Sequence, residues 1–256
     1  MDFSKEVLRY DEQAIMRLRS LYRQFGYTQY RMSRFEEYEL YAENKAFLTS
    51  GDIITFSGAS GKLMALRPDV TLSIVKNTKD DGGLKKLYYN ENVYRPDGHE
   101  FKEQMQVGLE CIGDVDVYSM SEVLMLASRS LETLGERSCL DISHMGFLNG
   151  LFRDEDLTAE RRAEIIKRIS ERNRHELHKL CCEYGISEAS QNSIISLAAL
   201  YGPIDKAIIE LERLSINDET RDALSELEAE LTETGLFRDL DVDELLREYG
   251  FEDDAY

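Results

Sequence analysis

Residues 88–113 read YYNENVYRPDGHEFKEQMQVGLECIG, and this stretch decides the fold. Its first half, from Leu87 to Arg95, has the aromatic and β-branched character of a strand, and Pro96-Asp97-Gly98 is typical of a compact turn. The second half alternates polar or small residues with apolar ones: Gln104, Gln106, Gly108 and Glu110 against Met105, Val107, Leu109 and Cys111. The pattern predicts an antiparallel hairpin with one polar and one apolar face.

The polar face of this hairpin has two interpretations. An antiparallel sheet often exposes one face to water, and polar side chains there need no further role. Alternatively the face is the floor of a ligand site, in which Arg95 offers a planar fork to an anion and Gln106 and Glu110 offer acceptors to a cation. The spacing alone leaves both open.

The composition is that of a soluble globular protein. The chain has 256 residues, of which 42% are hydrophobic and 32% charged, enough for one large domain or two smaller ones. No run approaches the roughly 18 apolar residues of a membrane span. The start, Met1 to Glu6, lacks the basic and apolar regions of a secretory signal. We therefore expect a cytoplasmic protein with no membrane partner.

The charge balance argues against a nucleic-acid partner. The 31 basic and 50 acidic residues give a formal net charge of −19, whereas binding to nucleic acid depends on Lys and Arg contacts to phosphate. The four cysteines, at positions 111, 139, 181 and 182, form no C-x-x-C pair, and the four histidines form no H-E-x-x-H. We expect reduced thiols, no metal site and no cofactor.

Apolar spacing and turn residues predict the remaining elements of the first half. Asp69 is a plausible N-cap for the helix that begins at Thr71, because its carboxylate can accept a backbone N–H in the first turn. The expected elements are a helix over 5–25, a strand over 27–35, two short strands around a Gly/Ser turn over 56–66, a helix over 71–77, a helix over 115–134 and a strand over 139–146.

From about residue 149 the chain reads as helices without an intervening strand. The apolar positions predict helices over 158–184, 187–201, 203–214 and 217–235, each ended by a glycine or followed by a proline or a capping residue. We therefore expect a core over 1–148, a helical insertion subdomain over 149–236, and a return strand with an acidic tail over 237–256.

Three segments resemble a known family. Val93-Tyr94-Arg95, the run from Lys102 to Gly113 (KEQMQVGLECIG) and Leu66 to Thr71 (LRPDVT) are similar to the class II aminoacyl-tRNA synthetase fold in its histidyl form. More closely still, they resemble the regulatory subunits of ATP phosphoribosyltransferase (HisZ), which act in the first step of histidine biosynthesis. The resemblance implies an α+β fold, a synthetase-like antiparallel sheet flanked by helices, with a helical insertion.

The resemblance also implies a binding site. Five residues fall on positions that bind histidine in the synthetase: Asp69, Thr71, Arg95, Gln106 and Glu110. Carboxylates suit an ammonium or imidazolium group, and Arg95 suits a carboxylate or phosphate. We expect a histidine-like ligand site and no catalytic residue, although Asp69 has the cap as an alternative role.

The function implied is that of a non-catalytic regulatory subunit needed for the activity and the histidine feedback of ATP phosphoribosyltransferase. Its expected partner is the short-form catalytic subunit, in a hetero-oligomer that also self-associates, because the segment after Tyr27 resembles the family's dimer-forming motif 1, with Ser33 in place of its proline. The hairpin connection, Pro96 to Phe101, lacks the arginines by which synthetases hold ATP. The sequence reaches Tyr256 without the glycine-rich motif 3 of the family.

Two alternatives stay open at this point. The first is a trimmed histidyl-tRNA synthetase paralogue that activates an amino acid with ATP. The second is an inactive fragment, in which an incomplete sheet would leave an exposed edge.

Overall fold

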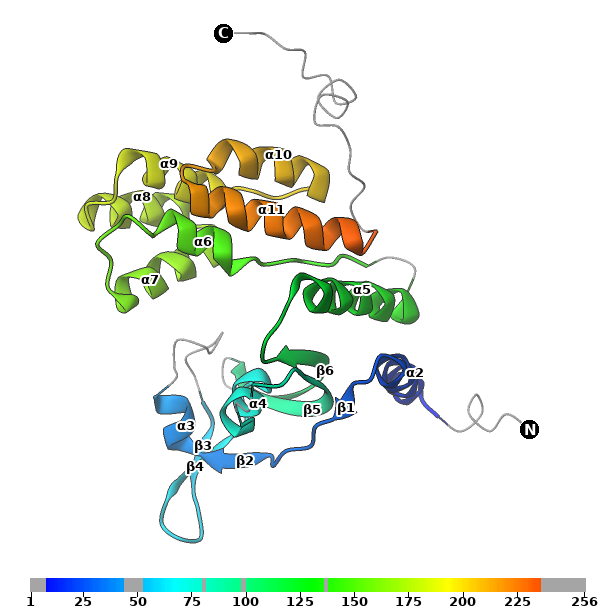
Figure 1. Cartoon of the computed structure of the whole chain (residues 1–256). Coiled ribbons are helices and arrows are strands. Elements are labelled where there is room, and N and C mark those ends of the chain that lie inside the picture. The colour runs from blue at the N-terminus through cyan, green and yellow to red at the C-terminus, as the bar shows by residue number, and fades with distance from the viewer. Residues whose placement is uncertain (1–7, 44–52, 80–81, 98–99, 136–137, 236–256) are drawn as a thin grey trace. The chain divides into compact units, whose positions relative to one another are not determined.

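The computed structural model describes residues 8–43, 53–79, 82–97, 100–135 and 138–235 (Figure 1). The chain divides into two compact units, Met1–Leu140 and Asp141–Tyr256. The first unit carries the described strands together with four helices, and the second is helical. The expected boundaries at 148/149 and 236/237 stay predictions, and the return strand and tail over 237–256 lie outside the described residues.

The predicted hairpin is the longest pairing in the described residues. Strands β5 (Lys85–Asp97) and β6 (Glu100–Ile112) pair antiparallel from Lys85 opposite Ile112 to Asp97 opposite Glu100. A short strand β1 (Thr28–Gln29) adds to β5 in parallel, so the order is β1-β5-β6. Only residues 98 and 99 separate the two long strands, which is a tighter connection than the six residues expected from Pro96 to Phe101.

A second three-stranded sheet precedes the hairpin in the chain. It has the order β2-β4-β3 and is antiparallel throughout, with β2 at Phe35–Glu37, β3 at Thr55–Ser57 and β4 at Leu63–Leu66. The predicted pair of strands around a Gly/Ser turn is confirmed, and Gly61 (φ +78°) supplies the left-handed turn conformation. Helix α3 (Tyr38–Ala42) follows β2.

The strand predicted over 27–35 is wrong as a single element. Residues 28–29 join the first sheet and residues 35–37 join the second, and the chain between them crosses from one sheet to the other. Arg67 donates hydrogen bonds to two backbone carbonyls of this segment. Its Nη1 donates to Ser33 O (2.8 Å), and its backbone N–H donates to Arg34 O (3.1 Å). These groups are therefore satisfied without a strand neighbour.

Helices cover both faces of the hairpin. Helix α2 (Tyr10–Gln24) and helix α5 (Val117–Leu134) pack on one face, in a cluster that includes Tyr88 and Leu126 with Val107 and Leu109 against it (Figure 1). Helix α4 (Thr71–Asn77) packs on the other face. The apolar face of β6 is therefore in the core as predicted, and the polar face lies beside α4.

Helix α4 spans the residues predicted for it, and α2 and α5 lie within their predicted ranges. The first part of the predicted 5–25 helix, residues 5–7, lies outside the described residues. No helix in the described part of the chain is both long enough and apolar enough to cross a membrane.

The second unit contains six described helices (Figure 1). They are α6 (Met145–Leu151), α7 (Ala159–Ser170), α8 (Arg174–Glu183), α9 (Glu188–Leu197), α10 (Ile204–Leu214) and α11 (Asp218–Glu233). The helices predicted over 187–201, 203–214 and 217–235 are present. Helix α6 approaches α11 closely, because a Cβ at Gly150 would lie 2.8 Å from Thr220 Cγ2.

Two predictions for this part of the chain are wrong. The strand expected over 139–146 is irregular up to His144 and then enters α6, whose Phe147 and Leu151, one turn apart, are buried. The single helix expected over 158–184 is two helices. Arg172 takes a left-handed conformation (φ +55°) and Asn173 Oδ1 accepts from Glu176 N–H to begin α8.

Arg67 links the two sheets of the first unit. Its side chain is fully buried, and Nη2 donates to Glu91 Oε2 (3.0 Å) and to Asn92 O (2.8 Å) on β5. Its backbone carbonyl accepts from the N–H of Tyr94 (2.9 Å). A single residue at the end of β4 therefore bonds to the chain before β2 and to the middle of β5.

We predict that Arg67→Met lowers the free energy of unfolding by roughly 3–5 kcal/mol, because it leaves the carboxylate of Glu91 and two backbone carbonyls without their donor. Urea titrations followed by circular dichroism measure this. The matched control is Lys62→Met, which removes an exposed ion pair to Glu37 (2.6 Å) and should cost less than about 1 kcal/mol. Equal effects of the two substitutions would contradict the structural role of Arg67.

Candidate functional site

The candidate site lies on the face of the hairpin that is turned toward α4. Alternation along β5 puts Tyr89, Glu91, Val93 and Arg95 on this face, and the register puts Gln106, Gly108 and Glu110 of β6 beside them. Packing of Tyr89 and Val93 against Val70 and Ile74 identifies the face. The connection from β4 to α4, residues 67–70, brings Asp69 and Thr71 to the same place.

Thr71 and Glu110 are in direct contact. The hydroxyl of Thr71 donates to Glu110 Oε1 at 2.6 Å, which joins the first residue of α4 to the centre of the predicted polar face. Burial raises the pKa of Glu110, the hydrogen bond from Thr71 lowers it, and the negative charge of Asp69 raises it again; the net shift is upward. Glu110 is therefore not a solvated surface carboxylate.

Asp69 has the cap role that the sequence allowed. Its Oδ1 accepts from the backbone N–H of Leu72 at 2.9 Å, in the first turn of α4. The residue is half-buried, and its charge reaches both Glu110 and Tyr89. Asp69 therefore fixes the start of α4 and also adds negative potential beside Glu110.

The ring of Tyr89 lies over Gly108. A Cβ at position 108 would come within 2.5 Å of the Tyr89 hydroxyl, so this approach requires glycine. Burial, followed by the nearby charge of Glu110, raises the pKa of Tyr89 to about 12. The phenol is neutral at physiological pH and keeps its proton as a hydrogen-bond donor.

Arg95 and Gln106 lie further along the same face. Arg95 Nε donates to the carbonyl of Pro68 at 3.1 Å, which holds the guanidinium beside the β4–α4 connection. Gln106 is half-buried and lies opposite Glu91 in the register. Of the five predicted residues, the structure bonds Thr71 to Glu110, and it bonds Arg95 of β5 to the β4–α4 connection that carries Asp69. Among the described residues it gives Gln106 no hydrogen bond to the other four.

Three residues of this face were missed by the sequence reasoning: Arg67, Tyr89 and Glu91. Alternation along β5 was a usable signal, because Tyr89 and Glu91 have the same parity as Arg95. The burial of Arg67 had no local signal, since its acceptors at positions 33, 91 and 92 are distant in sequence. The role assigned to the five predicted residues stays a prediction.

The charges of the face are arranged in two parts. Asp69 and Glu110 form an acidic part around the start of α4, and Arg95 supplies a cation at the other side of the β4–α4 connection. Carboxylates accept hydrogen bonds from an ammonium or imidazolium group, and a guanidinium binds a carboxylate in a bidentate manner. The arrangement suits a small zwitterion such as an amino acid.

A separate cavity of about 690 Å³ lies on the opposite face of β6. It is lined mainly by apolar side chains of α2, β6 and α5, among them Leu18, Val107 and Leu131. None of the five predicted binding residues lines it. Asp11 is the one charged residue of this lining, and recognition of a zwitterion also needs a cationic group, so the cavity is not the predicted site.

Comparisons with known proteins identify relatives of the chain. A model of the family described as histidyl-tRNA synthetase matches residues 1–247. The histidine–tRNA ligase of Archaeoglobus fulgidus is 26% identical over 242 residues, which are 92% of this chain and 58% of that protein. The ATP phosphoribosyltransferase regulatory subunit of Shouchella clausii is 30% identical over 235 residues, which are 87% of this chain and 59% of that protein.

A solved structure gives the fold. The crystal structure of an ATP phosphoribosyltransferase regulatory subunit/histidyl-tRNA synthetase from Bacillus halodurans aligns with a TM-score of 0.69 at 24% identity, over 87% of this chain and 60% of that chain. The predicted α+β, class II synthetase-like fold is confirmed. The chain spans between half and three-fifths of the length of the curated relatives it matches.

The shifted pKa of Glu110 predicts a pH dependence of stability. Because the pKa is raised in the folded protein, the folded state holds a proton that the unfolded state releases near its ordinary value of 4.5. Ionisation of Glu110 therefore lowers the free energy of unfolding as the pH rises above 4.5. Glu110→Gln keeps an acceptor for Thr71 and removes this cost, so its stability relative to the native chain should increase from about pH 4 to pH 7.

Glu103→Gln, on the same strand, is the matched control with the opposite sign. Hydrogen bonds from Tyr94 and Asn92 lower the pKa of Glu103, so its contribution is present above the ordinary value of 4.5 and is lost as the pH falls below it. Thermal melts at a series of pH values compare the two variants. The same pH trend in both would contradict the burial of Glu110.

Proposed function

The chain belongs to the histidyl-tRNA synthetase family, and from this premise we propose that it is a non-catalytic regulatory subunit of ATP phosphoribosyltransferase. In this role it binds the short-form catalytic subunit, raises its activity and carries its feedback response to histidine. The name of the 30% identical relative, an ATP phosphoribosyltransferase regulatory subunit, supports the proposal.

The observation that carries the proposal is the tight end of the hairpin. The strands stay paired to Asp97 opposite Glu100, which leaves two residues between them, and the segment from Pro96 to Phe101 contains no arginine. Holding a nucleoside triphosphate at such a loop needs cationic groups for its phosphates. Their absence from this segment supports a binding role over activation of an amino acid by ATP.

The site face supports histidine as the feedback ligand. The acidic part at Asp69 and Glu110 would accept the ammonium group, and Arg95 would bind the carboxylate. The neutral phenol of Tyr89 would donate to the ligand or to Glu110 without adding charge. The net charge of −19 supports a role that does not require tRNA.

A trimmed synthetase paralogue that activates an amino acid with ATP is the second candidate. The 26% identical histidine–tRNA ligase of Archaeoglobus fulgidus favours it, since that identity is close to the identity of the regulatory relative. The two candidates use the same face of the hairpin and differ in whether ATP binds there.

We expect this chain to co-purify with the catalytic ATP phosphoribosyltransferase of its organism and to raise formation of phosphoribosyl-ATP, with inhibition by histidine. Tagged pull-down followed by the activity assay with and without histidine measures both effects. A chain that forms no complex and gives no activation would refute the regulatory proposal.

The site itself is tested in that complex by Glu110→Gln combined with Arg95→Ala. Loss of both ligand contacts should raise the histidine concentration for half-inhibition by at least about 100-fold, while complex formation stays intact, because each charged hydrogen bond contributes roughly 1.5–3 kcal/mol. The control on the same hairpin is Glu103→Gln combined with Lys102→Ala. Unchanged inhibition in the site variant would reject the histidine site and leave the partner proposal standing.

The synthetase candidate makes its own prediction. It requires ATP–pyrophosphate exchange that depends on histidine and falls in Arg95→Ala. We expect no exchange above background from the isolated chain, because residues 96–101 lack the arginines needed for the triphosphate. Histidine-dependent exchange that the substitution abolishes would replace the regulatory proposal with the synthetase one.

A further inference from the structure

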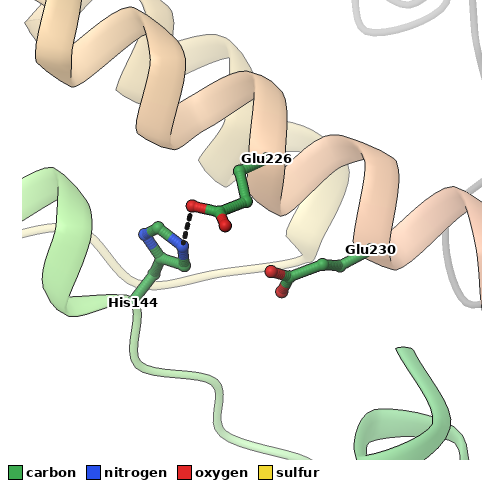
Figure 2. Close-up of side chains that lie close together, drawn as sticks. All are labelled: His144, Glu226 and Glu230. Atoms are coloured by element: carbon green, nitrogen blue, oxygen red, sulfur yellow. Dashed lines mark ion pairs between the residues drawn. The ribbon is translucent and has the colours of Figure 1, made fainter. Parts of the chain in front are cut away.

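A histidine and two glutamates of the helical unit lie close together (Figure 2). His144 directly precedes α6, and Glu226 and Glu230 are one turn apart on the same face of α11. One ligand atom from each of the three side chains lies within 4.8 Å of the others. The separation of His144 Nε2 and Glu226 Oε2 is 3.6 Å.

We propose that His144, Glu226 and Glu230 bind a divalent transition-metal ion that links α6 to α11. The site is independent of the proposed regulatory role and lies within the second unit. Its three ligands come from two elements that are far apart in sequence and are brought together by the packing of α6 on α11.

The distances suit an ion better than a direct bond. Ligand atoms at about 2.1 Å from a tetrahedral ion are roughly 3.4 Å apart. The 3.6 Å between Nε2 and Oε2 is close to that value and is longer than a normal hydrogen bond. The ligand atoms of all three side chains lie within 4.8 Å of one another.

The surroundings hold the ligands in place. A Cβ at Gly146 would lie 2.7 Å from His144 Cε1, so the imidazole packs directly on the backbone of α6. Glu230 is only 4% exposed, whereas the side chain of Glu226 is 45% exposed and that of His144 17%. The cluster is therefore built from the buried side of α11 and opens to solvent at Glu226.

The charge of the cluster favours a cation. Carboxylates one helical turn apart repel each other, and Glu230 is buried. In the part of the chain that the structure describes, neither Lys nor Arg forms an ion pair with Glu226. A divalent ion would neutralise both carboxylates at once.

The donor set indicates the class of ion. Imidazole nitrogen with two carboxylates suits Zn²⁺, Co²⁺ or Ni²⁺, whereas Mg²⁺ and Ca²⁺ prefer oxygen ligands alone. Three protein ligands leave a position for water. Among the described residues, His144 Nδ1 is buried without a hydrogen-bond partner, and the lack of an acceptor behind a ligating imidazole weakens binding by about 10–100-fold. We therefore expect weaker binding than at a site whose ligating imidazole has such an acceptor.

Zn²⁺ binding by the full chain is measured by titration calorimetry and by the shift in melting temperature, with Co²⁺ as a spectroscopic probe. We expect one site, a higher melting temperature with the ion, and Co²⁺ absorption without the near-ultraviolet charge-transfer band of a thiolate. His144→Gln and Glu226→Gln should each weaken binding at least 10-fold. The matched controls His175→Gln and Glu212→Gln change exposed residues outside the cluster and should leave binding unchanged.

The chain offers a competing pair of ligands. His178 and Cys182 lie on one face of α8, with 3.8 Å between Nδ1 and Sγ. Loss of binding in Cys182→Ser with retention in His144→Gln would overturn the proposal, as would a thiolate band with Co²⁺. Absence of any Zn²⁺ binding up to 100 μM in the native chain would also overturn it, and would leave an ion pair between protonated His144 and Glu226.

Discussion

The buried guanidinium of Arg67 is the constraint on which the first unit depends. A buried cation is tolerated only where acceptors surround it, and here those acceptors are Glu91, Asn92 O and Ser33 O. They come from the long hairpin and from the segment that joins the two sheets. Satisfying one side chain therefore fixes both sheets relative to each other, and it fixes the two residues that follow, Pro68 and Asp69, beside β5.

The candidate site inherits its geometry from this arrangement. Because the β4–α4 connection is held at Arg67, Asp69 can begin α4 and Thr71 can reach Glu110. The same packing withdraws Glu110 from water next to another carboxylate, which makes its ionised form unfavourable. A ligand cation would relieve that cost. Residues that serve binding commonly lower the stability of the folded protein in this way.

The sequence predicted the elements that depend on local residue patterns and missed the features that depend on contacts between distant residues. Alternation from Gln104 to Cys111 predicted the hairpin and its two faces, and Asp69 with Thr71 predicted the start of α4. The break at Arg172 was missed because apolar spacing continues across it. The strand expected over 139–146 was wrong, and α6 was not predicted, because its burial depends on packing against α11. The contacts of Arg67 and of His144 join residues far apart in the chain, so no window of sequence contains them.

The two candidate functions differ in whether ATP binds at the hairpin end in addition to an amino acid on the face of the strands. Glu110 and Arg95, the residues proposed to bind an amino acid, both lie in paired strands, so their positions do not depend on the connection between the strands. The connection between the strands is the part of a hairpin most tolerant of insertions, and it is where further cations for a triphosphate could be added. Here the strands stay paired to Asp97 opposite Glu100, and residues 96–101 contain neither Arg nor Lys. Under the proposed regulatory role, the chain would keep the amino-acid contacts in its paired strands, while residues 96–101 lack the arginines by which synthetases hold ATP.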